Sequence, residues 1–142
     1  MKPEPVVLET TFNTPANRVW QAITDRKKMK QWYFSLKEFK PRVGFVFEFY
    51  GGENGGIQYL HHCEIKEVIP GKKLTHSWKY IDYPGESFVT WELFNEGDKT
   101  RLKLTHAGLE TFPADNPDFA KENFAGGWDY IINTSLKQYL RA

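Results

Sequence analysis

Cysteine is almost missing from this sequence, and long apolar runs are missing altogether. The single Cys63 has no partner within the chain for a disulfide, which favours a reducing compartment. No segment approaches the roughly 18 consecutive apolar residues that a membrane-spanning helix needs. The start of the chain, Met1 to Pro5, has no apolar run behind Lys2, so we expect no secretory signal. These absences together predict a cytoplasmic protein with no membrane span.

An excess of either charge is also missing. Lys and Arg number 19 and Asp and Glu number 18, which gives a formal net charge of +1. Such a balance creates no overall field that would hold the protein on nucleic acid or on an acidic membrane surface. We therefore expect no nucleic-acid partner.

Aromatic residues, in contrast, are abundant. The chain of 142 residues holds 11 Phe, 7 Tyr and 5 Trp, or 16% of the total. The length fits one domain, residues 1–142, with a substantial core. Rings in this number must pack against one another or line a cavity, because they are large and mostly apolar.

Alternation of apolar and polar residues predicts a series of strands. The segments with this period are Val6 to Phe12, Val43 to Tyr50, Ile57 to Val68, Leu74 to Tyr80, Ser87 to Phe94 and Thr100 to His106. Short turns separate the later segments, so neighbouring strands should pair antiparallel. The turn at residues 51–56 resembles a phosphate-binding loop only in its glycine content, and we interpret it as a hairpin tip.

Helical patterns follow the first strand and end the chain. Thr14 is the expected N-cap of the first helix, and Asp25 ends this helix or caps a second short one. A later start near Pro117 predicts one helix of about 25 residues, nearly 40 Å at ~1.5 Å per residue, that runs to the C-terminus. Gly126 and Gly127 inside it cost roughly 1 kcal/mol each in helix propensity, which indicates close approach to another element or a bend.

These elements predict an α+β architecture. One face of the sheet is densely aromatic, and the final helix has one apolar stripe, so a curved antiparallel sheet around the long C-terminal helix buries both. Two short helices follow the first strand. A strongly curved sheet around one helix often leaves space that side chains do not fill, and such cavities are mostly apolar. Rings that fill the interior completely are the alternative.

The order and spacing of several motifs resemble a known family. The run Phe12-Asn13-Thr14-Pro15-Ala16-Asn17-Arg18-Val19-Trp20-Gln21-Ala22-Ile23-Thr24-Asp25, followed by Trp32, is similar to the opening of the START/Bet v 1-like helix-grip (SRPBCC) superfamily. Later motifs resemble one branch of it, the homologues of the activator of Hsp-90 ATPase: Val68-Ile69-Pro70-Gly71-Lys72-Lys73-Leu74 with Trp78, Val89-Thr90-Trp91-Glu92-Leu93, Thr105-His106-Ala107-Gly108-Leu109, and Gly126-Gly127-Trp128 with Leu136.

This resemblance covers nearly the whole chain and implies the helix-grip fold. That fold has an antiparallel sheet of about seven strands, two short helices and a long C-terminal helix. For function, the resemblance implies binding of lipids, sterols or polyketides, or cyclase or hydrolase activity, as in different members of the superfamily. Many members of the branch have no assigned activity.

The candidate ligand site consists of residues that the pattern turns toward the C-terminal helix, or that lie on it. They are Trp32, Phe47, Phe49, Tyr59, His61, Trp78, Tyr80, Trp91, Leu104, His106, Phe124, Trp128 and Ile132. The aromatic members would form the walls of a cavity, and His61 and His106 would supply polar contacts. Core packing alone is the alternative for each ring.

A metal site is not expected. His61 and Cys63 alternate onto one face of a strand, but His62 points to the other face. Zinc would need a further ligand from another strand, and the spacing matches no established zinc pattern. The simpler interpretation is a small buried Cys63 beside a polar His61 on the concave face.

Several residues could take part in catalysis, but they do not form a complete catalytic motif. His106 is a candidate general base, or else a histidine near a strand end that bonds to the following turn. Ser87 and Ser135 carry hydroxyl groups, but neither lies in a Gly-x-Ser-x-Gly motif. We therefore assign no catalytic residue.

Three functions stay open from the sequence. The favoured one is a module that binds a small apolar or amphipathic molecule between sheet and helix, without a cofactor. The second is a chaperone-associated domain that acts through its surface. The third is an enzyme of the cyclase or hydrolase kind, with His61 or His106 and a tyrosine as acid and base. The sequence does not identify the ligand. It also does not distinguish a monomer from a homodimer.

Overall fold

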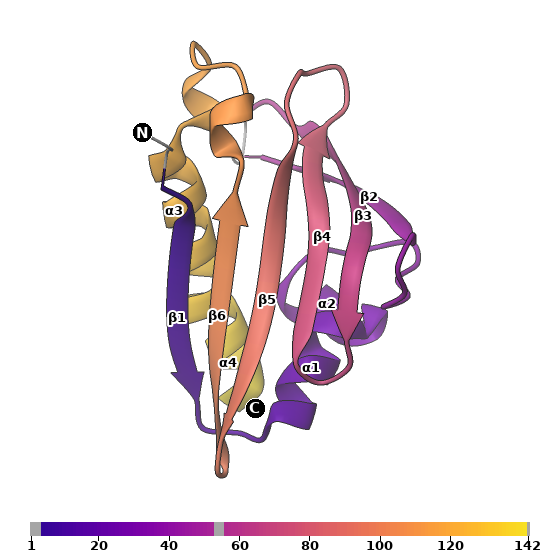
Figure 1. Ribbon diagram of the computed structural model, residues 1–142, viewed down its shortest axis with the longest axis vertical. Coiled ribbons are helices and arrows are strands. Elements are labelled where there is room, and N and C mark those ends of the chain that lie inside the picture. Colours follow the sequence, from indigo (N-terminus) through magenta and orange to yellow (C-terminus); the bar gives the residue numbers. More distant parts are fainter. Residues whose placement is uncertain (1–3, 53–55, 142) are drawn as a thin grey trace.

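A curved sheet carries a helical layer on its inner side in the computed structural model (Figure 1), which describes residues 4–52 and 56–141. Two features from the sequence analysis, the first residues of the chain and the tip of the glycine-rich turn, lie outside the described residues.

The described residues form six antiparallel strands in the order β1-β6-β5-β4-β3-β2. Consecutive strands from β2 to β6 are neighbours, and β1 pairs with β6, so that Val6 lies opposite His106. Tight turns are sufficient for such a meander, because antiparallel neighbours need only a short connection. The strands are β1 Val6–Phe12, β2 Val46–Gly51, β3 Tyr59–Ile69, β4 Lys73–Tyr80, β5 Ser87–Glu96 and β6 Lys99–Ala107.

Alternation divides the sheet into a buried and an outer face, as predicted. On β3, for example, His61, Cys63 and Ile65 are buried and the residues between them are less so. The same alternation continues on β4, β5 and β6. A register shift between Ile65 and Glu67 marks a bulge against β4, and bulges increase local bending of a sheet. The predicted aromatic face is therefore the concave, buried face.

The second strand is shorter than predicted. It begins at Val46 and not at Val43, because Gly44 has a left-handed backbone with φ +92°. The N–H of Gly44 still donates to the carbonyl of Ile65 at 2.8 Å, which ties this irregular segment to β3. Alternation of apolar side chains alone did not reveal that the backbone leaves the extended region here.

Two short helices, α1 Ala16–Thr24 and α2 Arg26–Trp32, follow β1 as predicted. Asp25 caps α2, because its carboxylate accepts hydrogen bonds from two backbone N–H groups of the first turn. The expected cap at Thr14 is wrong, since α1 has no side-chain cap. The Thr14 hydroxyl accepts a hydrogen bond from the Arg18 guanidinium at 3.3 Å instead.

The C-terminal helix is divided, whereas the sequence predicted one continuous helix from Pro117. Ala120 has an extended backbone with ψ 145°, so the helix proper starts only after it. Phe119 is buried immediately before this break. The helical segments after β6 are the 3₁₀ turns η1 Leu109–Thr111 and η2 Pro117–Phe119, then α3 Lys121–Tyr130, the π-helical η3 Ile131–Leu136, and α4 Lys137–Arg141.

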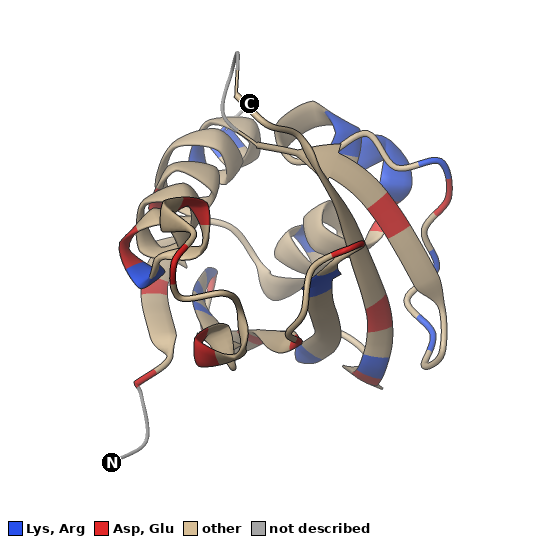
Figure 2. Cartoon of the chain, turned by 90° about the horizontal axis from the view of Figure 1, so that it is seen from above, with Lys and Arg blue, Asp and Glu red and all other residues tan. Residues whose placement is uncertain are grey.

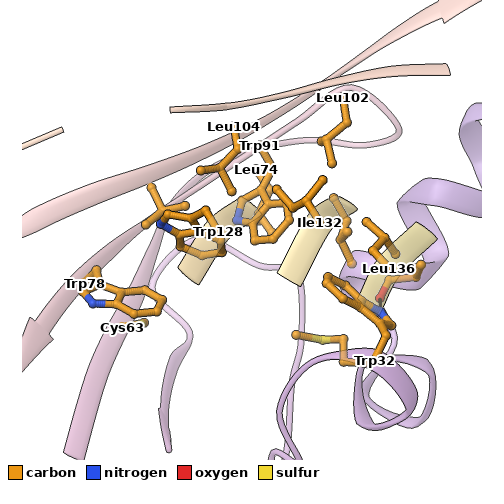
Figure 3. Close-up of a cluster of buried hydrophobic side chains, with 14 of the residues drawn as sticks. Trp32, Cys63, Leu74, Trp78, Trp91, Leu102, Leu104, Trp128, Ile132 and Leu136 are labelled. Atoms are coloured by element: carbon orange, nitrogen blue, oxygen red, sulfur yellow. Dashed lines mark hydrogen bonds between the residues drawn. The ribbon is translucent and has the colours of Figure 1, made fainter. Parts of the chain in front are cut away.

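The core lies between the concave face and this helix. The ring of Trp128 on α3 lies 5.4 Å from the ring of Trp78 on β4 and 5.5 Å from that of Trp91 on β5, measured between centroids. Figure 3 shows these indoles together with Leu102, Leu104 and Ile132. The sheet thus closes over the C-terminal helix, and the α+β helix-grip architecture is confirmed.

Candidate functional site

A pocket of about 510 Å³ opens at one end of the fold, between the start of β3, the end of β4 and the start of α3. Figure 1 shows these segments together at the upper end of the molecule. The volume lies within the ~300–1,000 Å³ that is usual for small-molecule sites. The pocket is therefore large enough for a ligand of moderate size.

Aromatic and aliphatic side chains form most of the pocket wall. Trp78 and Tyr80 come from β4, and Phe124 and Trp128 come from α3. Phe34, Ile57, Phe119 and Ile131 complete this apolar part. Rings that a folded chain leaves in contact with open space favour an apolar ligand surface, because water beside them is displaced at a gain in free energy.

Polar side chains gather at the start of α3. Asp118, Glu122 and Asn123 line the pocket there, and Tyr59 lies opposite on β3. The Tyr59 hydroxyl donates a hydrogen bond of 2.6 Å to the Asp118 carboxylate, and this bond raises the pKa of Tyr59. This link holds the start of β3 against the turn that precedes α3.

Two glycines on α3 also line the pocket. A Cβ atom added to Gly126 or to Gly127 would meet no other atom within 4 Å. Of the two alternatives predicted for these glycines, close approach to another element is therefore wrong. The absence of side chains leaves space beside α3, and a ligand can approach the helix backbone there.

His61 is the imidazole on the pocket wall. Its Nδ1 lies 2.9 Å from the Tyr59 carbonyl, which can only accept, so Nδ1 carries the proton and Nε2 the lone pair. Burial lowers the pKa of His61 to about 4, although the carbonyls of Tyr59 and Phe49 oppose this shift. The ring is therefore neutral near pH 7 and offers an acceptor at Nε2.

His106 is fully buried behind this wall and forms a hydrogen-bonded chain. The Trp128 indole donates to Nδ1 of His106 at 3.0 Å. Nε2 of His106 lies 2.7 Å from the Ser87 hydroxyl, which in turn donates to the Trp78 carbonyl at 2.8 Å. Each polar side-chain atom in this series of hydrogen bonds thus has a partner, as buried polar groups require.

The donor and acceptor roles in these hydrogen bonds argue against a Ser87–His106 nucleophile pair. Because Nδ1 of His106 accepts from Trp128, the neutral ring carries its proton on Nε2 and donates to Ser87. A general base would need its lone pair on that nitrogen. Burial also lowers the pKa of His106 to about 3. His106 is a structural histidine that joins β5, β6 and α3, and not the expected partner of the turn after its strand.

The thirteen predicted site residues separate into three groups. Those that line the pocket are Tyr59, His61, Trp78, Tyr80, Phe124 and Trp128. Trp32, Phe47 and Trp91 surround a separate recess of only about 10 Å³ near the two short helices. Phe49, Leu104, His106 and Ile132 are buried in the core between sheet and helix.

Sequence reasoning left several lining residues out. Asp118 follows the helix start that was predicted near Pro117, and Gly126 and Gly127 were interpreted only as an irregularity in the helix. Glu122, Asn123 and Phe34 carried no signal, because their position depends on where α3 begins and on the turn after α2. The break at Ala120, which sets the start of α3, follows from tertiary packing and not from local pattern.

One buried hydroxyl close to the site is unpartnered. The Tyr33 hydroxyl has no hydrogen bond to any described residue and is shielded from solvent. Burial raises its pKa well above the usual value, and Cys63 and Tyr80 act in the same direction. Such a group costs free energy unless something satisfies it.

Among residues 4–52 and 56–141, no group of three or more His, Cys, Asp or Glu side chains is placed to hold a metal ion. In the same ranges, no helix is both long and apolar enough to cross a membrane.

Comparison with known proteins identifies the family. A family model described as "Activator of Hsp90 ATPase homolog 1-like protein" matches residues 13–141. The chain belongs to this family. The resemblance seen in the sequence motifs is thus confirmed.

Individual relatives agree with this assignment. The Hsp90 co-chaperone AHA1 of Saccharomyces cerevisiae is 28% identical over 127 residues, which is 84% of this chain and 33% of the yeast protein. This chain therefore spans about a third of that relative's length. A Mesorhizobium loti protein of known structure has a TM-score of 0.76 at 25% identity, with 97% of both chains covered. DynU16, from the dynemicin biosynthetic locus, shares the fold at 21% identity with a TM-score of 0.78 over 99% of this chain and 48% of its own.

Proposed function

We propose that this protein binds a small apolar or amphipathic molecule in the pocket between β3, β4 and α3, in the cytoplasm and without a cofactor. The observation that carries the proposal is the open volume of about 510 Å³ next to a wall of aromatic rings. The single cysteine, which is buried, agrees with a reducing location.

The shape of the wall supports binding over simple core packing. Elsewhere the concave face is filled, as around Trp91 and Leu104, which are 2% and 0% exposed. In the middle of α3, by contrast, glycines stand at two successive positions and leave open space. A helix gains stability from almost any other residue there, so the unfilled volume is consistent with a role in binding.

Intrinsic fluorescence provides the test. Trp78 and Trp128 both line the pocket, so a bound molecule should change the emission of the protein. A panel of fatty acids, fatty alcohols, sterols and flavonoids would be titrated, with isothermal calorimetry as a second readout. We expect saturable binding by at least one class.

A matched pair of variants locates the site. Gly127→Trp places an indole into the open space beside α3, and Ala125→Trp adds the same ring at an exposed position that does not line the pocket. Binding should be lost in the first variant and kept in the second. Absence of binding by the whole panel, or equal affinity of both variants, would contradict the proposal.

A chaperone-associated role is the second candidate, because of the 28% identity with the yeast co-chaperone. It predicts that the protein raises the rate of ATP hydrolysis by an Hsp90-type chaperone. A rate that does not change at saturating protein would exclude it. Gly127→Trp separates the two functions, since a surface interaction should survive a filled pocket.

A further inference from the structure

The polar rim of the pocket is acidic and made of hydrogen-bond acceptors. Asp118 and Glu122 both line the pocket and both carry carboxylates. The Tyr59 hydroxyl already donates its proton to Asp118 at 2.6 Å and accepts a hydrogen bond from the Asn116 amide at 3.5 Å, so it has no proton left to donate to a ligand.

In the part of the pocket wall that the structure describes, these carboxylates have no basic side chain beside them. None of the described lining residues is Lys or Arg. Within the described residues, neither Asp118 nor Glu122 takes part in an ion pair. Lys121 lies between them in sequence but is exposed and does not line the pocket. Figure 2, which looks down on this end of the molecule, shows acidic positions there with a basic position beside them.

Much of the remaining pocket wall is apolar. Trp78 on β4 and Phe124 and Trp128 on α3 line the pocket, whereas Asp118 lies in the turn before α3. A ligand that fills the pocket would therefore place an apolar body against the rings and a polar head against the acceptors. An ammonium group has donors and no acceptor, so it complements the rim in both charge and hydrogen bonding. A carboxylate head would meet two like charges and no cation.

We propose that the pocket selects apolar molecules with a protonated amine head and discriminates against those with a carboxylate head. This inference rests on the proposed function, since it assigns a ligand class to the same pocket. Asp118 and Glu122 are the residues that set the selectivity, and the aromatic wall supplies affinity that is common to both kinds of ligand.

Three probes with the same chain and different heads test the charge preference: dodecylamine, dodecanol and dodecanoate, each below its micelle concentration. Their affinities would be measured by tryptophan fluorescence and calorimetry at neutral pH. We expect the amine to bind at least about tenfold more tightly than the carboxylate, with the alcohol between them. Added salt should reduce the ratio, because the rim is open to solvent.

Variants assign the effect to the rim. Asp118→Asn combined with Glu122→Gln keeps the shape of the side chains and an acceptor for Tyr59 but removes both charges. The ratio of dodecylamine affinity to dodecanoate affinity should then fall to about one. Glu110→Gln on η1 removes one exposed charge that does not line the pocket, and the ratio should persist. Circular dichroism would show that each variant folds.

The outcomes are distinguishable. Equal affinities for all three probes, or tightest binding of dodecanoate, would overturn the inference about the head group and leave the binding function standing. A ratio that is unchanged in the double variant would also overturn it. Failure of all three probes, with another class of the panel still bound, would overturn the inference alone. Failure of the whole panel would overturn both the binding function and the inference that rests on it.

Discussion

The indole N–H of Trp128 donates to Nδ1 of His106, with 3.0 Å between the nitrogens. His76 has an equivalent bond, since its Nε2 lies 3.2 Å from the indole nitrogen of Trp91. Both indoles can only donate, so each histidine must present a lone pair to them. The aromatic interior thus depends on histidines that stay neutral.

Acid should destabilise the protein because of these histidines. Burial lowers the pKa of His106 to about 3 and those of His61 and His76 to about 4. In the unfolded chain the value is about 6.5, so below it the unfolded state binds more protons than the folded state. The stability present above about pH 6.5 is therefore lost as the pH falls toward 4, by up to ~1.4 kcal/mol per pH unit for each ring.

Urea unfolding between about pH 6.5 and pH 5 measures this slope. The slope of the unfolding free energy against pH reports how many protons are taken up on unfolding. His61→Gln should reduce that number by about one, since it removes one of the titrating rings. A free energy of unfolding that does not vary over this range would contradict the assignment of neutral buried histidines.

Alanine in place of Gly126 or Gly127 should stabilise the protein. Neither added Cβ meets an atom within 4 Å, and each change should gain about 0.5–1 kcal/mol from helix propensity. Gly85→Ala is the matched opposite: φ is +107° there and the Cβ would lie 2.5 Å from the Thr111 carbonyl oxygen. In thermal unfolding, the melting temperature should rise for the Gly126 and Gly127 variants and fall for Gly85→Ala. A fall in all of them would mean that α3 is packed more tightly than the structure shows.

Removal of the Tyr33 hydroxyl should leave the protein equally stable or more stable. Among the described residues this hydroxyl has no hydrogen-bond partner, and an unsatisfied buried group costs about 1–3 kcal/mol. Tyr33→Phe keeps the ring, which stacks on Trp32 at 5.0 Å between centroids. Chemical denaturation compares the two proteins, with Tyr80→Phe as a control that loses a real bond to Trp78. Destabilisation by Tyr33→Phe would reveal a partner for the hydroxyl, such as an ordered water.

The thiol of Cys63 should react slowly in the native protein. Its side chain is fully buried, and burial raises the pKa of the thiol well above the usual range. Thiolate is the reactive form, so labelling requires local or global opening of the structure. We expect labelling by Ellman's reagent to be at least about a thousandfold slower than in concentrated urea. Rates within about tenfold of each other would contradict the burial of this strand.

The sequence predicted the sheet well because period-two patterns follow directly from the geometry of a strand. The concave residues of β3 to β6, such as Cys63, Trp78, Trp91 and Leu104, all lie on the buried face. Asp25 was also recognised as a helix cap from its local pattern alone. Where backbone conformation departs from pattern, as at Gly44 and Ala120, the boundaries were wrong.

The pocket was harder to predict than the fold. Burial identifies which side chains face the helix, but it does not tell which of them border empty space. Phe49 and Trp78 are equally in phase on their strands, and only Trp78 lines the pocket. The acidic rim depends on where the chain turns before α3, and that turn is fixed by contacts such as Tyr59 with Asp118, which are 59 residues apart.

The spacing of the three central indoles has an optical consequence. Trp78 and Trp91 each lie within 5.5 Å of Trp128, with ring planes inclined at 59° and 88°. Chromophores so close and so inclined share their excited states, and the far-ultraviolet spectrum should contain an exciton couplet. Excitation can pass between rings this close, so a molecule that quenches one of the three indoles should also lower the emission of the other two.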